Sequence, residues 1–294
     1  MAVTAATIKE LREKTGVGMM DCKRALVEAG GDMQEAVKIL RKKGIATAQK
    51  KSARAASEGL IHSFIADDNT VGAMVEVGCE TDFVARTDDY IALVNDLAKH
   101  VVEFAPADNN ALLSSSWKGG GTVKDFIVEK VAKLGENIQF RRFVRYEGAL
   151  VSSYIHAGGK VGVLMELGLE SQADSSDAEI EEVVKDLCMQ VAASAPRFVR
   201  RDEVSDETLA AERDIYRSQV LAQGKPENIV DKIVDGKMNK FYSENCLLEQ
   251  AFVKEPSIKV MDYIDGRAKA RLKVVRFARF QLGEGLPESG RKVK

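Results

Sequence analysis

Apolar residues recur with a helical period through the first 45 residues of the chain. Two segments place apolar side chains at positions i, i+3, i+4 and i+7, namely Cys22, Ala25, Leu26 and Ala29, and then Met33, Ala36, Val37 and Leu40. A shorter stripe at Ile8 and Leu11 precedes them and ends near Gly16. Asp32 followed by Glu35 is typical of a capped helix start. The pattern predicts a small module of three helices.

The body of the chain contains an internal repeat of alternating apolar and polar positions. Residues 58–80 match residues 147–170, with equivalent positions 90 residues apart. Val71, Gly72, Glu76, Gly78 and Glu80 recur as Val161, Gly162, Glu166, Gly168 and Glu170, and the register continues into the segment that follows. Alternation around short polar turns predicts a β-hairpin followed by a helix in each copy. A second similarity, 142–146 with 276–280, adds one strand to each half.

A helical insertion separates the second repeat from the strand that completes it. Helical periodicity extends over 209–221 and 229–241, and Gly224 and Pro226 between them are typical of a helix stop and a helix start. We expect an antiparallel helical hairpin that projects from the body. Together the patterns predict an α+β protein with a small N-terminal three-helix module, a duplicated core of antiparallel sheets with helices packed on one face, and the projecting hairpin.

These patterns divide the 294 residues into six segments. They are an N-terminal three-helix module at 1–45, a basic linker at 46–57, a first core repeat at 58–146, a second core repeat at 147–201, a helical hairpin insertion at 202–250, and the last core strand or strands with a short basic C-terminal tail at 251–294. We expect the linker to be either mobile or helical.

Composition indicates a globular chain with an aliphatic core. Hydrophobic residues make up 45% of the sequence and charged residues 30%, but aromatic residues only 6%. Charged residues near the start predict that no secretory signal peptide is present, and no apolar stretch reaches the roughly 18 residues of a membrane span. The four cysteines lack metal-binding spacing. We therefore expect a reduced, cytoplasmic protein.

Charge is distributed unevenly, although the formal net charge is only −2. Residues 1–54 contain twelve Lys and Arg against six Asp and Glu, and residues 267–294 contain nine against two, so these ends carry +6 and +7 and the body carries −15. This distribution favours a charged macromolecular partner, although clustered solvated charges explain it equally well. A nucleic-acid-binding arm at 41–54 is a further alternative.

Catalytic and metal-binding motifs are missing from the sequence. The histidines at 62, 100 and 156 form no metal-binding pattern, and no G-x-S-x-G nucleophile motif occurs. The glycine-rich segment 158–160 lacks the first glycine of a phosphate-binding loop, and the segment 119–122, GGGT, contains no lysine. We expect no enzymatic chemistry, no cofactor and no bound metal.

Two methionines at a predicted helix start are candidates for a contact with a partner. Residues 15–21 place Met19 and Met20 beside Gly18, and at least one of the two is expected to face outward. An exposed methionine offers an adaptable apolar contact. The alternative is that both methionines fill gaps in a small core.

The junction at residues 79–87 connects a predicted strand to a predicted helix. The simplest structural interpretation makes Asp82 the helix cap and Phe83 the first core residue. The second repeat argues against it, because the corresponding stretch, 170–173, reads ESQA and contains neither Asp nor Phe. If the fold required this pair, the duplicate would contain it as well. The difference indicates a functional role for the junction.

These two segments resemble the signatures of the bacterial elongation factor Ts family, the nucleotide-exchange factors of elongation factor Tu. The first signature is carried by Leu11-Arg12, Thr15-Gly16, Gly18-Met19-Met20-Asp21 and Lys23-Arg24-Ala25-Leu26, and the second by residues 76–86. The resemblance runs from about residue 3 to about residue 286. The departures are Gly78, where the family usually has Asn, an Asn- and Ser-rich insertion at 108–121, and a short basic tail where some members have a further helix.

The resemblance implies a fold and a set of partner-binding residues. The fold would combine an N-terminal module of ubiquitin-associated type, a duplicated α+β core and a helical hairpin. One group of residues is implied to reach the GTPase near its magnesium site, a second to touch a neighbouring helix of the same domain, and a third to touch another domain. These are Thr81, Asp82, Phe83 and Val84 (the 81–84 corner), then Leu11, Met19 and Met20, and then His156.

The implied function is that of a translation elongation factor acting as a guanine-nucleotide exchange factor. Such a factor binds elongation factor Tu with GDP, displaces magnesium and promotes GDP release so that GTP can bind, without covalent chemistry or a cofactor. The expected partner is the GTPase, without membrane or direct nucleic-acid contacts, and a homodimer or a 2:2 complex through the core or the hairpin is compatible with it. The alternatives are a ubiquitin-associated-type binding adaptor and RNA binding through the basic ends.

Overall fold

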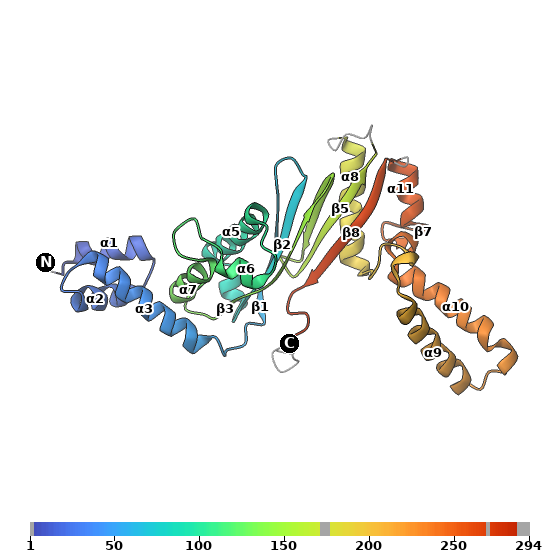
Figure 1. Ribbon diagram of the computed structural model, residues 1–294, viewed down its shortest axis with the longest axis horizontal. Helices are drawn as coiled ribbons and strands as arrows, with labels where there is room; N and C mark the ends of the chain where they lie inside the picture. The colour runs from blue at the N-terminus through green and yellow to red at the C-terminus, as the bar shows by residue number, and fades with distance from the viewer. Residues whose placement is uncertain (1–2, 171–176, 269–270, 287–294) are drawn as a thin grey trace.

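The computed structural model describes residues 3–170, 177–268 and 271–286 and has an elongated shape (Figure 1). The helices are α1 (Ala5–Thr15), α2 (Met19–Glu28), α3 (Met33–Lys51), α4 (Asp82–Ala85), α5 (Asp88–Phe104), α6 (Asn109–Ser114), α7 (Val123–Leu134), α8 (Ala178–Ser194), α9 (Asp206–Ala222), α10 (Glu227–Asn245) and α11 (Val260–Ala268), with short 3-10 turns η1 (Arg201–Glu203) and η2 (Leu247–Glu249). The strands are β1 (Glu58–Ile65), β2 (Val71–Cys79), β3 (Ile138–Glu147), β4 (Leu150–His156), β5 (Val161–Leu169), β6 (Ala251–Phe252), β7 (Glu255–Lys259) and β8 (Leu272–Gln281). The predicted α+β class is confirmed.

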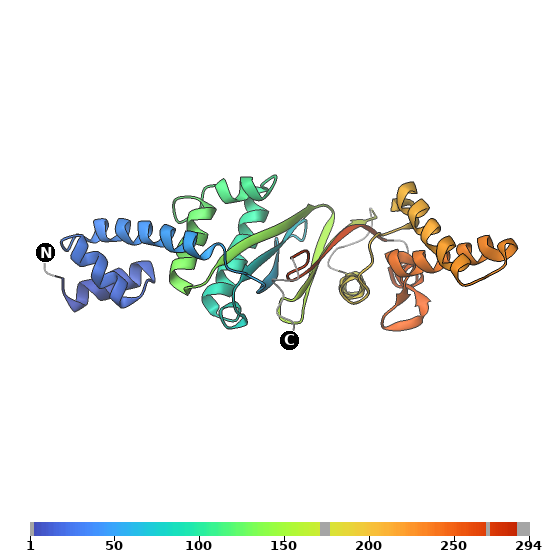
Figure 2. The same ribbon diagram turned by 90° about the horizontal axis from the view of Figure 1, so that it is seen from below.

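The two ends of the molecule are helical and its centre is formed by sheets. Helices α1–α3 occupy one end and the α9–α10 hairpin the other, and Figure 2 shows the same order from below. Between them lie two three-stranded antiparallel sheets, with strand orders β1-β2-β3 and β4-β5-β8. We keep the division into six segments as a proposal for the domain boundaries.

The three N-terminal helices have a core of their own. It consists of Leu11, Cys22, Ala25, Leu26, Ala36 and Leu40, all of which are buried. The Asp32 carboxylate accepts a hydrogen bond from the Glu35 backbone N–H at 2.8 Å, so the expected cap of α3 is present. Val37, which belongs to the same predicted stripe, lies at its edge and is 38% exposed.

Helix α3 is longer than the module requires and connects it to the first repeat. It continues to Lys51, so the first part of the predicted linker is helical and not mobile. Gly44 lets α3 approach α7 closely, because a Cβ added there would lie 3.4 Å from Ala132 Cβ. Arg41 pairs with Asp125 of α7 at 3.1 Å. The module is therefore docked on α7 along α3.

The two core repeats share the same strand arrangement and the same irregularities. The pairing of β2 with β3 is interrupted after Glu76, and the pairing of β5 with β8 after Glu166, which is 90 residues later. Helices α5 and α8 both end on an alanine with positive φ, 46° at Ala105 and 45° at Ala195. The predicted duplication thus extends to positions where the backbone is irregular.

The inner faces of the two sheets pack directly against each other, an arrangement that the sequence patterns do not predict. The contact consists of Ile61, Met74, Tyr146, Val151, Leu164 and Phe280, in which each residue of one repeat has its equivalent from the other. The Ser63 hydroxyl lies 2.9 Å from that of its equivalent, Ser153. Equivalent residues that touch each other define an approximate two-fold axis between the repeats.

Equivalent ion pairs in the two repeats follow the same approximate two-fold symmetry. Arg142 Nε lies 2.6 Å from Glu76 of the neighbouring strand, and the guanidinium stands 4.0 Å from the centroid of the Phe280 ring in the other sheet. In the second repeat Arg276 Nε lies 2.6 Å from Glu166. Glu76 is fully buried, so its pairing with arginine compensates for the cost of its burial.

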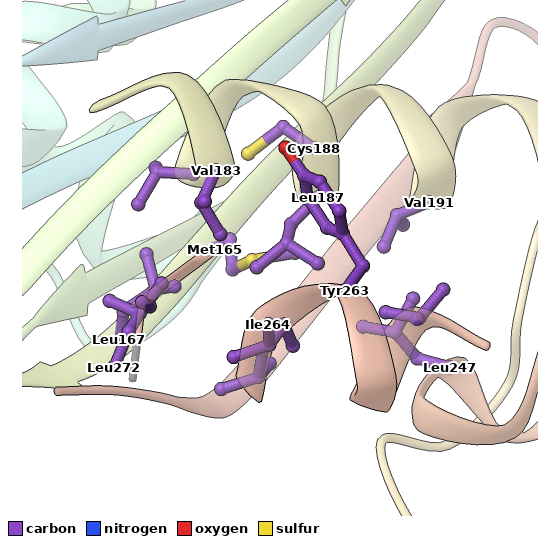
Figure 3. Packing of buried hydrophobic residues seen from close by; sticks show 14 of the residues in the cluster. Met165, Leu167, Val183, Leu187, Cys188, Val191, Leu247, Tyr263, Ile264 and Leu272 are labelled. Atoms are coloured by element: carbon purple, nitrogen blue, oxygen red, sulfur yellow. The ribbon is translucent and has the colours of Figure 1, made fainter. Parts of the chain in front are cut away.

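The outer face of each sheet is covered by helices. Helix α5 packs on the first sheet and α8 on the second (Figure 1). Figure 3 shows side chains of α8, α11 and β5 converging in this outer core, among them Leu187, Tyr263 and Met165. The core therefore has four layers: helix, sheet, sheet and helix.

The predicted helical hairpin is present, and several smaller elements were not predicted. Helices α9 and α10 pack through Val220, Val230, Val234, Met238 and Phe241. Helices α6 and α7, the β6–β7 pair and α11 have no counterpart in the sequence prediction. The predicted insertion at 108–121 contains α6 and leads into α7. The predicted basic tail lies largely outside the described residues.

We predict that Gly162→Ala destabilises the protein by about 1–3 kcal/mol, because overpacking forces the two sheets apart. A Cβ at Gly162 would lie 2.5 Å from Ile61 Cγ2 and 2.7 Å from Met74 Sδ. Gly168→Ala in the same strand is the control, since its nearest neighbour would lie 3.7 Å away. The free energy of unfolding in urea measures both. Equal stabilities of the two variants would contradict the tight contact.

Candidate functional site

The 81–84 corner is a short turn of helix between the end of β2 and the start of α5. Helix α4 begins at Asp82, and its N-cap is Thr81, whose side chain accepts a hydrogen bond from the Val84 backbone N–H at 3.3 Å. The expectation that Asp82 caps the helix is therefore wrong. A threonine cap leaves the carboxylate of the next residue available for other contacts.

Phe83 points into solvent. Its exposed fraction is 81%, whereas Ala85 two residues later is only 4% exposed and Val84 packs partly against the core of the first repeat. The interpretation of Phe83 as the first core residue is therefore wrong. An aromatic side chain so exposed on an ordered turn contributes little to folding and is typical of a contact with a partner.

Asp82 has one local partner, the guanidinium of Arg86. The two lie 2.9 Å apart, with the side chain of Asp82 33% exposed and that of Arg86 79% exposed. Such exposed i,i+4 pairs contribute only about 0.3–0.5 kcal/mol. The carboxylate can therefore exchange this partner for another at little cost.

Glu136, which was not predicted from the sequence, binds the start of the 81–84 corner through its carboxylate. Its carboxylate accepts hydrogen bonds from the backbone N–H groups of Glu80 and Thr81 at 3.1 and 3.0 Å, and from the Thr81 hydroxyl at 2.6 Å. The available sequence signal is Gly135, which ends α7 with a φ of 76° and is separated from β3 by two residues. That signal predicts the turn but not its partner.

Cys79 lies beneath the corner and is fully buried. Its thiol donates a hydrogen bond to the Thr81 carbonyl at 3.1 Å. Burial raises the pKa of this thiol to about 11, since the thiolate would be poorly solvated. The neighbouring Tyr90 hydroxyl donates to the Val77 carbonyl at 2.7 Å. The packed floor beneath the corner, formed by Cys79 and Tyr90, is therefore both buried and hydrogen-bonded.

The N-terminal module presents a separate apolar surface. Met19 is 45% and Met20 65% exposed, so both methionines face outward. Val27, which was not predicted, lies seven residues after Met20 on the same face of α2 and is 61% exposed. Leu11 is fully buried in the core of the module. The expectation of a direct contact through Leu11 is corrected: it supports α1 and does not reach the surface.

His156 lies on the second sheet, at the end of β4, and is exposed. Its Nδ1 is 3.1 Å from the Tyr154 hydroxyl. The predicted site residues therefore belong to three separate surfaces: the 81–84 corner, the N-terminal module and the β4 end. The counterpart of the corner in the second repeat, at 170–173, lies largely outside the described residues.

Metal-binding clusters and membrane-spanning helices are absent from the described ranges. There, no group of three or more His, Cys, Asp or Glu side chains could hold a metal ion. In the same ranges no helix is both long and apolar enough to cross a membrane.

Comparison with known proteins assigns the family. Residues 80–284 match the family described as Elongation factor TS. The chain is 44% identical over 289 residues to an elongation factor Ts of Clostridium botulinum (strain Alaska E43 / Type E3) and 49% identical over 292 residues to one of Magnetococcus marinus. Each comparison covers 97% of this chain and 94% of the relative. The chain belongs to the elongation factor Ts family.

Membership of the elongation factor Ts family makes the chain a translation elongation factor. A relative from Trichlorobacter lovleyi, 45% identical over 293 residues, also covers 97% of this chain and 94% of its own length. The matches therefore span the N-terminal module as well as the core, and the family match includes both the 81–84 corner and Glu136. The resemblance inferred from the two sequence signatures is confirmed.

We predict that Cys79 resists alkylation in the folded protein. A thiol reacts as its thiolate, and a pKa raised from 9.0 to about 11 lowers the thiolate fraction at pH 8 roughly a hundredfold. Iodoacetamide labelling at pH 8, with mass spectrometry of the Cys79 peptide, measures the rate in buffer and in guanidinium. Equal rates in the two solutions would contradict a packed floor beneath the corner.

Proposed function

We propose that this elongation factor Ts homologue is the guanine-nucleotide exchange factor of elongation factor Tu. The observation that carries the proposal is the 81% exposure of Phe83 on a corner that is held by Thr81 and Glu136. A bulky aromatic side chain on a pre-organised turn can insert between side chains of a partner without an ordering cost. The same feature has no use in the packing of this fold.

The corner acts on the nucleotide site of the GTPase from outside. GDP is held there through its phosphates and a magnesium ion, which is the largest local charge in such a site. Phe83 inserts between packed side chains behind the phosphate-binding loop and displaces them. Asp82 leaves its weak pair with Arg86 and disturbs the ligands of the magnesium. The phosphates then lose their positive counterpart, and GDP dissociates.

Exchange follows from linkage and requires no covalent step. The factor binds the nucleotide-free GTPase more tightly than the GDP form, and by reciprocity GDP or GTP weakens the binding of the factor by the same ratio. Incoming GTP therefore completes the nucleotide site and releases the factor. The chain contributes side chains and shape, and the magnesium involved belongs to the GTPase.

Two further surfaces hold the GTPase in register with the corner. Met19, Met20 and Val27 form an exposed apolar surface on α2 that fits a helix of the partner. His156 at the end of β4 offers a polar contact to another domain. Because α3 docks the module on α7, the α2 surface and the corner are held on one scaffold. We place this function in the cytoplasm.

We predict that Phe83→Ala lowers the rate of GDP release from elongation factor Tu while leaving the fold intact. Loss of an aromatic anchor costs about 2 kcal/mol or more, which is roughly a thirtyfold lower rate below saturation. An exposed substitution changes stability by about 0.5 kcal/mol at most. Release of a fluorescent GDP analogue into excess GDP measures the rate. Phe104→Ala is the control, since Phe104 is an aromatic residue 50% exposed on α5.

A rate for Phe83→Ala that equals that of the wild type would refute the role of the corner. A rate lowered as much by Phe104→Ala would show that exposed aromatic residues in general support the protein.

We predict that Met20→Ala weakens binding to the GTPase about fivefold but leaves the maximal exchange rate unchanged. The module supplies affinity at a distance from the nucleotide, so its loss is overcome by raising the concentration of the factor. Rates measured over a range of factor concentrations separate the two quantities. Ile45→Ala on α3, where the residue is 47% exposed, is the matched control. A lowered maximal rate would instead assign the methionine a direct part in exchange.

A further inference from the structure

We propose that Glu136 is a positioning residue that presents Phe83 to the GTPase, an inference that rests on the proposed exchange function. Its carboxylate accepts three hydrogen bonds at the start of the 81–84 corner, two from backbone N–H groups and one from the Thr81 hydroxyl. Thr81 in turn caps α4. One side chain thus determines where the turn that carries Phe83 begins.

The segment that carries Glu136 is itself fixed on two sides. The Asn137 backbone N–H donates to the Glu80 carboxylate at 2.7 Å, and the Asn137 side chain donates to the Arg54 carbonyl at 2.7 Å. Lys51, the last residue of α3, donates to the Gly135 carbonyl. Residues 135–137 therefore join the end of α3 to the corner, and the carboxylate is held before a partner binds.

Phe83 depends on this support because it has little packing of its own. It is 81% exposed, and the turn around it is held only at its ends, by Glu136 and the Cys79 thiol at its start and by the partly packed Val84 and the buried Ala85 at its end. The direction of the ring is then set by the backbone of a four-residue helix. Loss of the Glu136 carboxylate leaves the contacts at the end of the turn and allows the turn to change its orientation.

The sequences of the two repeats differ both at Glu136 and at the 81–84 corner. The pairing of Cys79 with Ile138 corresponds to that of Leu169 with Leu272, so the counterpart of Glu136 is position 270, which is alanine in the sequence. The counterparts of Thr81, Asp82 and Phe83 are Ser, Gln and Ala. The carboxylate and the exposed phenylalanine therefore occur together in the first repeat, and both are replaced in the sequence of the second repeat.

The first experiment compares Glu136→Ala with Glu136→Gln. Alanine leaves three donors without their acceptor, whereas the glutamine amide still accepts from the backbone and donates to the Thr81 hydroxyl. GDP release is measured against factor concentration, with urea unfolding of each variant. We expect the maximal rate to fall about tenfold with alanine and by less than about threefold with glutamine. Glu129→Ala, an exposed glutamate of α7, should match the wild type.

The second experiment tests whether Glu136 acts through Phe83. In a Phe83→Ala background, Glu136→Ala should lower the maximal rate by less than about twofold, whereas in a Met20→Ala background it should keep its full effect. Thr81→Val and Thr81→Ser test the same contact if Glu136→Ala fails to fold, because valine removes the hydroxyl that donates to Glu136 and caps α4, whereas serine keeps both interactions. We expect serine to preserve the maximal rate and valine to lower it.

The outcomes separate this inference from the proposed function. If Phe83→Ala slows release and Glu136→Ala does not, Glu136 is no positioning residue and the exchange function stands. Equal effects of Glu136→Ala with and without Phe83 would overturn the inference as well, since the residue would then act through stability alone. If Phe83→Ala itself leaves release unchanged, the exchange function of the corner fails, and the inference fails with it.

Discussion

The close contact between the two central sheets is the constraint on which the rest of the structure depends. Gly72 and Gly162 are equivalent positions, and a Cβ at either would lie within 3 Å of side chains from the other sheet. The absence of a side chain there lets Ser63 reach its equivalent Ser153 at 2.9 Å. Once the inner faces are used in this way, each sheet has only its outer face for helices. The module and the hairpin must therefore attach at the ends, which produces the elongated molecule.

Because the two core repeats are equivalent, features that differ between them indicate roles other than packing. The bulges after Glu76 and Glu166 occur in both repeats, so the fold accounts for them. The 81–84 corner and Glu136 belong to the first repeat, and their sequence counterparts in the second lack both the phenylalanine and the carboxylate. Packing cannot require a feature that the duplicate omits. Comparison of the repeats within one chain therefore separates residues that build the core from residues with another role.

Periodicity predicted what is local, and missed what depends on distant neighbours. The stripe through Leu26 and Leu40, the duplicated hairpins and the two hairpin helices follow from spacing alone, and all are present. The signature containing Met19 and Met20 located an exposed surface. Leu11, which the resemblance implied as a partner contact, instead lies in the module core, as its place on the apolar stripe with Ile8 indicates. The packing of one sheet on another has no sequence period of its own. Alternating apolar and polar residues separate the two faces of a strand, but they do not show whether a helix or a second sheet covers the apolar face. Glu136 lies 55 residues from Thr81, so only the folded chain brings the two together.

The exposure of Phe83 links the stability of this protein to its function in an unusual way. Most large apolar side chains of the first repeat gain free energy by burial, as Leu93 and Leu97 do on α5. Phe83 lacks that gain, and its exposed position is maintained by hydrogen bonds that the turn donates to the Glu136 carboxylate. Those bonds order a surface that the fold does not need. In the exchange function that we propose, this order favours binding, because a rigid turn loses less entropy than a mobile one. The proposed function therefore accounts for a folding cost that the packing of this protein does not explain.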